Sequence, residues 1–256
     1  MRTPIIVGNW KLNKTIGEAV TFVNSLHPLV VDVTDVEIVV APVFTGLSAV
    51  AQALARGDIR LAAQDVFWED RGAFTGEVSP EMLKDVGCDY VIIGHSERRQ
   101  YFSETNANVN RKAKAAHAHG LIPIICVGES LEEREAGKTG AVVKGHVLNG
   151  IAGLSADQIV STVIAYEPVW AIGTGQNATP DQAQEVHALI RSLLSEIYSV
   201  DVASQVRIQY GGSVKSKNAA ELIAQPDVDG ALVGTASWDA ESFAQIIKAA
   251  HDAFCN

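Results

Sequence analysis

Apolar and β-branched residues gather in eight short runs along the chain. The runs cover residues 5–9, 36–41, 59–64, 90–94, 121–127, 161–166, 205–210 and 230–233. Most are continuously apolar rather than alternating between apolar and polar positions, which is typical of strands buried on both faces. The pattern therefore predicts eight strands of a parallel sheet.

The segments between these runs carry the start and stop signals of helices. A Ser or Thr followed three residues later by Glu or Gln fits the capping box. This pattern occurs at Thr15/Glu18, Ser130/Glu133, Ser155/Gln158 and Thr179/Gln182. Ser79 before Pro80 fits an N-cap with proline in the first helical position, and Gly120 fits a helix C-terminus just before the fifth run.

Strand and helix alternating eight times predict an α/β fold, specifically a (β/α)₈ barrel. An open doubly wound sheet is the alternative. Pro123 inside the fifth run conflicts locally with a strand, because proline removes a backbone donor, but it lies near the start of the run. We find no linker, low-complexity tract or shift in charge, so residues 1–256 are predicted to form one domain.

Composition and charge narrow the possible functions. The chain has 256 residues, 47% of them hydrophobic and 20% charged, which is ordinary for a globular protein. Its net charge of −10 argues against nucleic acid and anionic membranes as partners. No apolar run approaches the ~20 residues of a membrane span, and the N-terminus lacks the apolar core of a signal peptide. A cytoplasmic protein is expected.

The cysteines and histidines suggest no cofactor. The three cysteines are odd in number and widely spaced, so they form neither a disulfide framework nor a metal set. Cys126 is expected to be a buried core thiol. His117 and His119 are two apart on a predicted helix and face different ways, so metal-ligand spacing is absent. We expect no metal and no cofactor.

The stretch after the sixth run has the features of a base beneath a lid. Glu167 follows the strand directly, and Pro168 biases it toward extended backbone. Four apolar residues come next, and Gly173-Thr-Gly175 then provides a flexible exit. A carboxylate at the root of a short hinged flap fits a catalytic base under a closing loop. The alternative is an ordinary loop with a packed Trp170 and a solvated Glu167.

Polar residues also follow the first and fourth runs. In extended backbone Asn9 and Lys11 would face the same way, with Trp10 opposite, and could bind an anion or polarise a carbonyl. His95 and Glu97 have the same spacing. Ser96 could cap the following turn, whose positive end would disfavour an imidazolium. We expect a neutral His95 that donates to a carbonyl, although a surface Lys11 and structural ion pairs around Glu97 are alternatives.

Glycine turns follow the seventh and eighth runs. Gly211-Gly212-Ser213 and Gly234-Thr235 each precede a helix and offer backbone N–H groups to one anion. In (β/α)₈ barrels the loops after strands 7 and 8 commonly bind phosphate. Base, neutral imidazole, lysine and phosphate site together favour proton abstraction next to a carbonyl. A Schiff-base aldolase using Lys11 and a phosphosugar-binding protein without turnover are the alternatives.

These motifs together resemble the triosephosphate isomerase family. The matching segments are Gly8-Asn-Trp-Lys11, Gly72-Ala-Phe-Thr-Gly-Glu77, Ile93-Gly-His-Ser-Glu-Arg-Arg99, Ala165-Tyr-Glu-Pro-Val-Trp-Ala-Ile-Gly-Thr-Gly175, Tyr210-Gly-Gly-Ser-Val214 and Leu232-Val-Gly234. The resemblance implies interconversion of dihydroxyacetone phosphate and glyceraldehyde 3-phosphate, in glycolysis and gluconeogenesis. It implies Glu167 as base and His95 as electrophile, supported by Ser96 and Glu97.

The resemblance also implies the remaining site residues and a homodimer. Asn9 and Lys11 would contact the substrate. The backbone N–H groups of Gly173, Ser213, Gly234 and Thr235 would hold its phosphate. The loop at 64–77, with Phe74 and Thr75, would insert beside the partner's active site. The chain departs from the family where Thr235 replaces a usual glycine, and its segment 65–70 is unusually aromatic for this loop.

Overall fold

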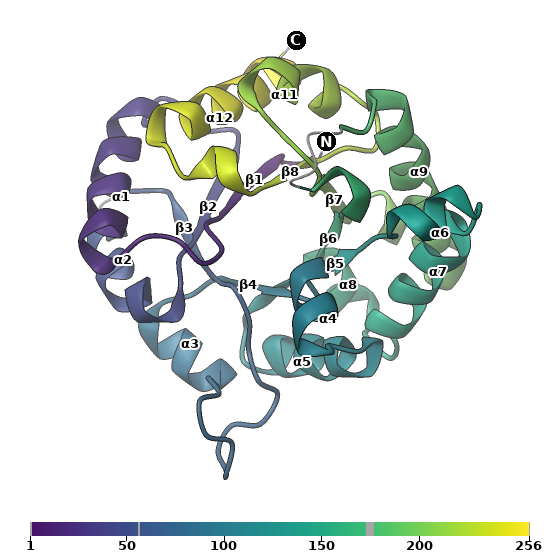
Figure 1. Ribbon diagram of the computed structural model, residues 1–256, viewed down its shortest axis with the longest axis horizontal. Helices are drawn as coiled ribbons and strands as arrows, with labels where there is room; N and C mark the ends of the chain where they lie inside the picture. Colours follow the sequence, from purple (N-terminus) through teal and green to yellow (C-terminus); the bar gives the residue numbers. More distant parts are fainter. Residues whose placement is uncertain (1, 56, 173–176, 256) are drawn as a thin grey trace.

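The protein is a closed barrel of eight parallel strands (Figure 1). The computed structural model describes residues 2–55, 57–172 and 177–255. The strands are β1 (Ile5–Asn9), β2 (Glu37–Ala41), β3 (Arg60–Ala63), β4 (Tyr90–Ile93), β5 (Ile122–Val127), β6 (Val163–Tyr166), β7 (Arg207–Tyr210) and β8 (Gly230–Val233). Each strand pairs with its neighbours in sequence, and β1 pairs with β8 to close the ring. The predicted (β/α)₈ fold is confirmed.

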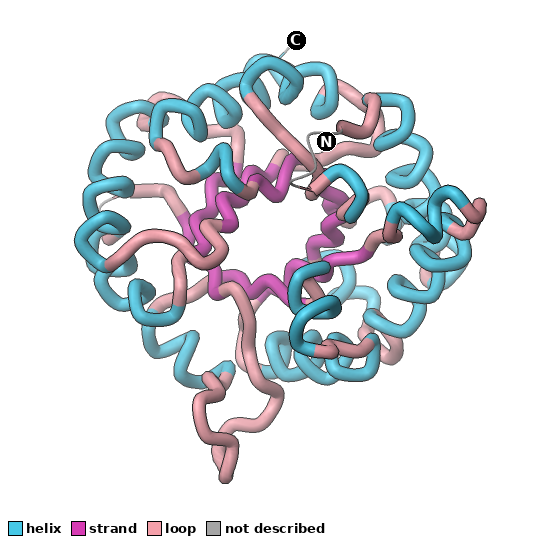
Figure 2. Tube along the Cα trace, in the orientation of Figure 1, coloured by secondary structure: helices cyan, strands magenta, loops and turns pink. Residues whose placement is uncertain are grey.

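Helices surround the strands on the outside (Figure 2). The longer helices are α1 (Ile16–Val30), α2 (Leu47–Leu54), α5 (Asn106–Ala118), α7 (Thr139–Gly150), α9 (Pro180–Ile197), α11 (Ser216–Ile223) and α12 (Ala240–Cys255). The shorter ones are α3 (Pro80–Val86), α4 (Ser96–Phe102), α6 (Leu131–Glu135), α8 (Ala156–Ser161) and α10 (Val200–Ala203). Single 3₁₀ turns η1 (Phe44–Gly46), η2 (Val169–Ala171) and η3 (Thr235–Ser237) follow β2, β6 and β8.

The predicted element boundaries hold to within two residues for the strands. The largest differences, of two residues, are at the starts of β6 and β7. At β6, Ser161 ends α8 and Thr162 forms its C-cap. Pro123 does lie in a strand, where it pairs with Val91 of β4. All four predicted capping boxes are present, at the starts of α1, α6, α8 and α9.

The strands bury both of their faces. Inward-facing side chains such as Val7, Ile92 and Ile124 form one apolar cluster inside the barrel. Outward-facing side chains such as Ile6 and Ile164 form a larger cluster with the helices. This two-sided burial explains why the strands are continuously apolar in sequence. It also leaves the strand ends as the places where polar side chains can gather.

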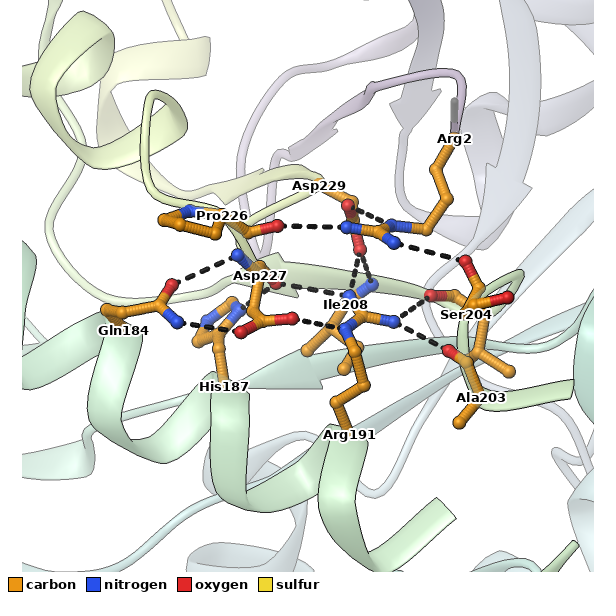
Figure 3. Close-up of polar contacts among 11 residues, drawn as sticks. Arg2, Gln184, His187, Arg191, Ala203, Ser204, Ile208, Pro226, Asp227 and Asp229 are labelled. Carbon is orange, nitrogen blue, oxygen red and sulfur yellow. Dashed lines mark hydrogen bonds and ion pairs between the residues drawn. The ribbon is translucent and has the colours of Figure 1, made fainter. Parts of the chain in front are cut away.

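A charged network ties the amino ends of β7 and β8 to α9 and the start of the chain (Figure 3). Arg191 Nη2 lies 2.7 Å from Asp229 Oδ2, and Arg191 Nε pairs with the carboxylate of Asp227. The same Asp229 oxygen accepts the N–H of Ile208 at 2.8 Å, and its other oxygen pairs with Arg2. The network therefore holds four separate chain segments at the end of the barrel opposite the strands' carboxyl ends.

The segment between β3 and α3 projects away from the barrel (Figures 1 and 2). Its aromatic residues pack on each other: the Phe67 ring lies 4.2 Å from Trp68 and 4.6 Å from Phe74, centre to centre. At its root, Asp65 contacts Lys112 Nζ at 2.6 Å and Arg98 Nη2 at 2.8 Å. The unusual aromatic content therefore braces the loop internally.

Candidate active site

Most of the predicted site residues line one cavity of about 490 Å³ at the carboxyl ends of the strands, whereas Ser96, Phe74 and Thr75 are not part of its lining. Its lining includes Asn9, Lys11, His95, Glu97, Glu167, Ser213, Gly234 and Thr235. These residues come from the ends of β1, β4, β6, β7 and β8, so the barrel brings together positions up to 226 residues apart, from Asn9 to Thr235. Gly173 lies outside the described residues.

Glu167 is buried beside two groups that stabilise its charge. Its side chain is 2% exposed, its Oε1 lies 2.8 Å from His95 Nε2, and its Oε2 accepts the Ser96 N–H at 2.9 Å. Burial alone would raise the pKa of Glu167, but His95 and the Ser96 N–H outweigh it and lower the pKa. Glu167 is therefore a carboxylate, as a base requires.

His95 is held in a defined tautomer. Its Nδ1 accepts the Glu97 N–H at 3.2 Å, so the ring proton belongs on Nε2, which faces Glu167. Burial lowers the pKa of His95, and the charge of Glu167 raises it above the ordinary value. Because Nδ1 accepts the Glu97 N–H, it cannot carry a proton of its own in this geometry. The contact at Nδ1 favours the imidazole with its proton on Nε2, and the neutral form of His95 stays a prediction.

This arrangement corrects the predicted role of Ser96. We expected the Ser96 side chain to cap the helix that follows β4. Instead His95 is the N-cap of α4, and the backbone N–H of Ser96 binds Glu167. The physical reason is that the imidazole Nδ1 reaches the Glu97 N–H and satisfies that free donor at the start of the helix.

Lys11 reaches the cavity through a left-handed backbone rather than an extended one. Its φ is +55°, unusual for a residue with a side chain. Asn9 Oδ1 accepts the Lys11 N–H at 3.1 Å, and the Gln64 amide donates to the Lys11 carbonyl at 3.0 Å. The Lys11 ammonium lies 2.5 Å from Glu97 Oε1. Asn9 and Gln64 therefore fix the lysine, and Glu97 pairs with it.

The two predicted anion-binding turns come close to the base and the lysine. A Cβ on Gly211 would lie 2.9 Å from Glu167 Cγ, and one on Gly234 would lie 3.4 Å from Lys11 Cε. Thr235 begins η3, and it is not among the described non-glycine residues with positive φ, so its backbone is ordinary. The first N–H groups of η3 have no partner within the turn.

Two functional contacts were missed in the sequence. Glu129 is fully buried, and its Oε1 accepts from Trp170 Nε1 at 3.0 Å and Tyr166 OH at 3.2 Å. Arg134 pairs with the same oxygen and stacks over the Trp170 ring. Glu129 thus anchors the start of the apolar flap after Glu167. The sequence signal for Glu129 was its position two residues beyond the end of β5. Similarly, the signal for the contact of Gln64 with Lys11 was that Gln64 directly follows β3.

The described part of the chain holds no evident metal site. Among residues 2–55, 57–172 and 177–255 there is no group of three His, Cys, Asp or Glu side chains placed to hold a metal ion. No helix of the described chain is both long and apolar enough to cross a membrane. Cys126 is fully buried, as predicted.

Comparison with known proteins agrees with this geometry. The family model described as triosephosphate isomerase matches residues 4–250. The chain is 60% identical to the triosephosphate isomerase of Geobacter metallireducens and 58% identical to that of Trichlorobacter lovleyi, each over 97% of this chain and 99% of the relative. The chain belongs to the triosephosphate isomerase family. The relative from Chloroflexus aurantiacus is 56% identical over 96% of this chain and 99% of its own.

The triosephosphate isomerase family is itself the standard example of a neutral histidine held by a helix N-terminus. The contact here follows that logic, because His95 caps α4 and accepts a backbone N–H. The departure from the family at Thr235 is accommodated by an ordinary backbone at the start of η3.

Proposed function

We propose that this protein is a triosephosphate isomerase, which interconverts dihydroxyacetone phosphate and glyceraldehyde 3-phosphate. The observation that carries the proposal is the contact between a buried carboxylate, Glu167, and the imidazole of His95, in one cavity with Lys11. A base, a proton donor and a cation are the groups that proton transfer next to a carbonyl needs. The relatives that bear this name match the chain from end to end.

In the proposed reaction Glu167 takes a proton from the carbon next to the substrate carbonyl. The electron pair moves to the carbonyl oxygen, where His95 Nε2–H and the Lys11 ammonium stabilise the charge. His95 supplies a proton to that oxygen to give an enediol. The deprotonated His95 then takes the proton of the hydroxyl on the other carbon, and Glu167 returns its proton to the former carbonyl carbon. A carbonyl forms at the other carbon, and both residues recover their starting states. Glu167 must leave the Ser96 N–H to reach the carbon.

The phosphate is proposed to lie against backbone N–H groups of Ser213, Gly234 and Thr235, with Gly173 contributing from the flap. Ser213, Gly234 and Thr235 line the cavity, and the dipole of a helix start favours an anion. Closure of the flap over the enediol would keep water away from an intermediate that otherwise can lose phosphate. The Glu129 contact to Trp170 would fix the hinge of that flap.

A coupled assay that follows consumption of glyceraldehyde 3-phosphate tests the activity directly. Absence of turnover by folded protein would leave a phosphosugar-binding protein. Borohydride trapping in the presence of substrate tests the Schiff-base alternative. We expect no adduct, because the Lys11 side chain is held in an ion pair with Glu97 rather than free to attack a carbonyl.

We further propose that the protein acts as a cytoplasmic homodimer of single-domain chains spanning residues 1–256. Large exposed apolar side chains follow four neighbouring strands, β1 to β4: Leu12, Ile16, Phe44, Phe74, Met82, Tyr101 and Phe102. Leu12 is 97% exposed and Phe74 44% exposed. Exposed apolar side chains that follow neighbouring strands fit an interaction site, and the projecting loop suits insertion into a second copy.

A further inference from the structure

The charges that line the active-site cavity are unevenly paired. Lys11 and Lys215 bring positive charge, and Glu97 and Glu167 bring negative charge. Lys11 is engaged with Glu97 at 2.5 Å, and Glu167 is in contact with His95. Lys215 is exposed and forms no ion pair within the described parts of the chain. It is therefore the lining cation whose charge is not already compensated by a neighbour.

Lys215 also occupies a position that disfavours a cation. It is the N-cap of α11, with extended backbone at φ −137° and ψ 162°. Ser, Thr, Asp and Asn are preferred at an N-cap, and a positive charge there opposes the helix dipole. The side chain of Asn218 does the capping instead, since its Oδ1 accepts the Lys215 N–H at 2.7 Å. Local rules are expected to be broken at functional sites.

An anionic substrate needs such a charge in this protein. The chain carries a net charge of −10, so a phosphate dianion is repelled at long range. Formally the four charged lining residues cancel, and removal of Lys215 would leave the cavity negative. Lys215 lies two residues beyond Ser213, beside the turn proposed to bind phosphate.

We propose that Lys215 guides the phosphate of the substrate into the cavity. This rests on the proposed isomerase function. Lys215 acts on capture of the substrate and not on the proton transfer, so its effect belongs in kcat/KM and not in kcat. Its charge acts through solvent, so the effect weakens as salt screens it.

The test compares Lys215→Gln with Lys217→Gln. Lys217 is in the same first turn of α11 and is exposed, but it does not line the cavity. The two variants change net charge equally. At low ionic strength we expect Lys215→Gln to lower kcat/KM about three- to tenfold, at the small end of steering effects, with kcat within about twofold of the parent. Lys217→Gln should stay within about twofold in both, and the difference should shrink at ~0.5 M NaCl.

Stability separates guidance from a structural role. Lys215→Ser installs a preferred N-cap, so it should keep or raise the melting temperature while lowering kcat/KM like Lys215→Gln. Equal kcat/KM for the two glutamine variants, a loss that salt does not change, or a lower melting temperature for both Lys215 variants would each overturn the inference. An inactive parent chain would instead refute the proposed function itself.

Discussion

At the scale of single residues, the active site depends on backbone groups as much as on side chains. The Ser96 N–H binds the base, the Glu97 N–H fixes the tautomer of His95, and the Lys11 carbonyl is held by Gln64. The sequence gives the chemistry of each side chain, but the roles of these backbone groups depend on where the chain turns. That the proposed catalytic residues lie together could therefore be predicted from residue type and strand-end position, while the cap on α4 that fixes the tautomer could not.

We expect kcat to depend strongly on the exact position of the Glu167 carboxylate. Glu167→Asp keeps the charge but moves the carboxylate back by about one bond. A misplacement of ~1 Å can cost ~10²-fold in rate. We expect kcat to fall at least that far with little change in KM, measured in the coupled assay. Near-normal kcat in this variant would remove Glu167 from the role of base.

The Thr235 N–H, rather than its side chain, should matter for phosphate binding. Thr235→Gly keeps the N–H, so affinity for a phosphate-bearing inhibitor should change by less than about tenfold, ~1.4 kcal/mol. Thr235→Pro removes the N–H. Because a hydrogen bond to a charged group contributes roughly 1.5–3 kcal/mol, binding should weaken about ten- to a hundredfold or more.

The comparison requires that the proline variant is folded, which circular dichroism and a melting curve establish. Normal inhibitor binding by a folded Thr235→Pro protein would exclude that N–H from the phosphate site. The ordinary φ of Thr235 makes both substitutions reasonable, since neither has to adopt a left-handed backbone.

At the scale of elements, strands were easier to predict than the contacts between their ends. Burial on both faces leaves a strong apolar signal, and capping boxes mark helix starts within a few residues of sequence. The network around Asp229 joins residues as far apart in sequence as Arg2 and Asp229, 227 positions, and no local sequence pattern predicts it. Such long-range ion pairs form only when the closed barrel brings their partners together.

That network should stabilise the barrel without taking part in catalysis. Asp229→Asn removes the charge between Arg191 and Arg2 and leaves a largely buried guanidinium less compensated. Breaking a buried ion pair is strongly destabilising, and at this chain length ~1 kcal/mol shifts the melting temperature by about 2–4 °C. We expect a decrease of roughly 5–10 °C by calorimetry, with activity at low temperature retained.

Glu81→Gln is the matched control, because its pair with Arg71 is exposed on both sides. An exposed pair contributes little, so the melting temperature should change by no more than about 2 °C. Equal effects of the two substitutions would mean that the Asp229 network does not stabilise the fold.

At the scale of the whole molecule, the first property to test is the proposed assembly of two chains into a dimer. Thr75 lies in the projecting loop between β3 and α3, next to the exposed Phe74. Thr75→Arg would force a charge into the proposed interface. We expect the parent to sediment as a dimer, and the variant as a monomer with most activity lost. A fully active parent monomer at assay concentration would defeat the dimer proposal.

The stability of the whole molecule should also decrease in mild acid because of buried histidines. Burial lowers the pKa of His187 to about 4, and burial followed by the nearby Arg99 lowers that of His146 to about 4. His187 is fully buried between the rings of Tyr166 and Tyr210. His146 Nδ1 accepts the Gly128 N–H, which favours the neutral ring.

The sign follows from proton binding. Between pH 6.5 and 4 the unfolded chain protonates these histidines, near their ordinary pKa of ~6.5, while the folded chain does not. The unfolded state therefore binds more protons, and the free energy of unfolding falls as pH decreases through this window. Above pH 6.5 the penalty is absent. For His187 alone it approaches about 3 kcal/mol near pH 4, at ~1.36 kcal/mol per pKa unit.

His187→Asn tests this at a single position. Asparagine keeps an N–H donor for the Asp227 carbonyl, which lies 3.0 Å from His187 Nδ1, but it does not titrate. Its general effect on packing is the same at every pH, so the informative quantity is the slope of unfolding free energy against pH, measured with urea from pH 7.5 to 4.5. We expect a shallower slope than in the parent, because one proton-binding site is lost from the unfolded state. An unchanged slope would mean that His187 already binds its proton in the folded barrel, and the fully buried ring would then need a charge-compensating contact between α9 and the start of β8.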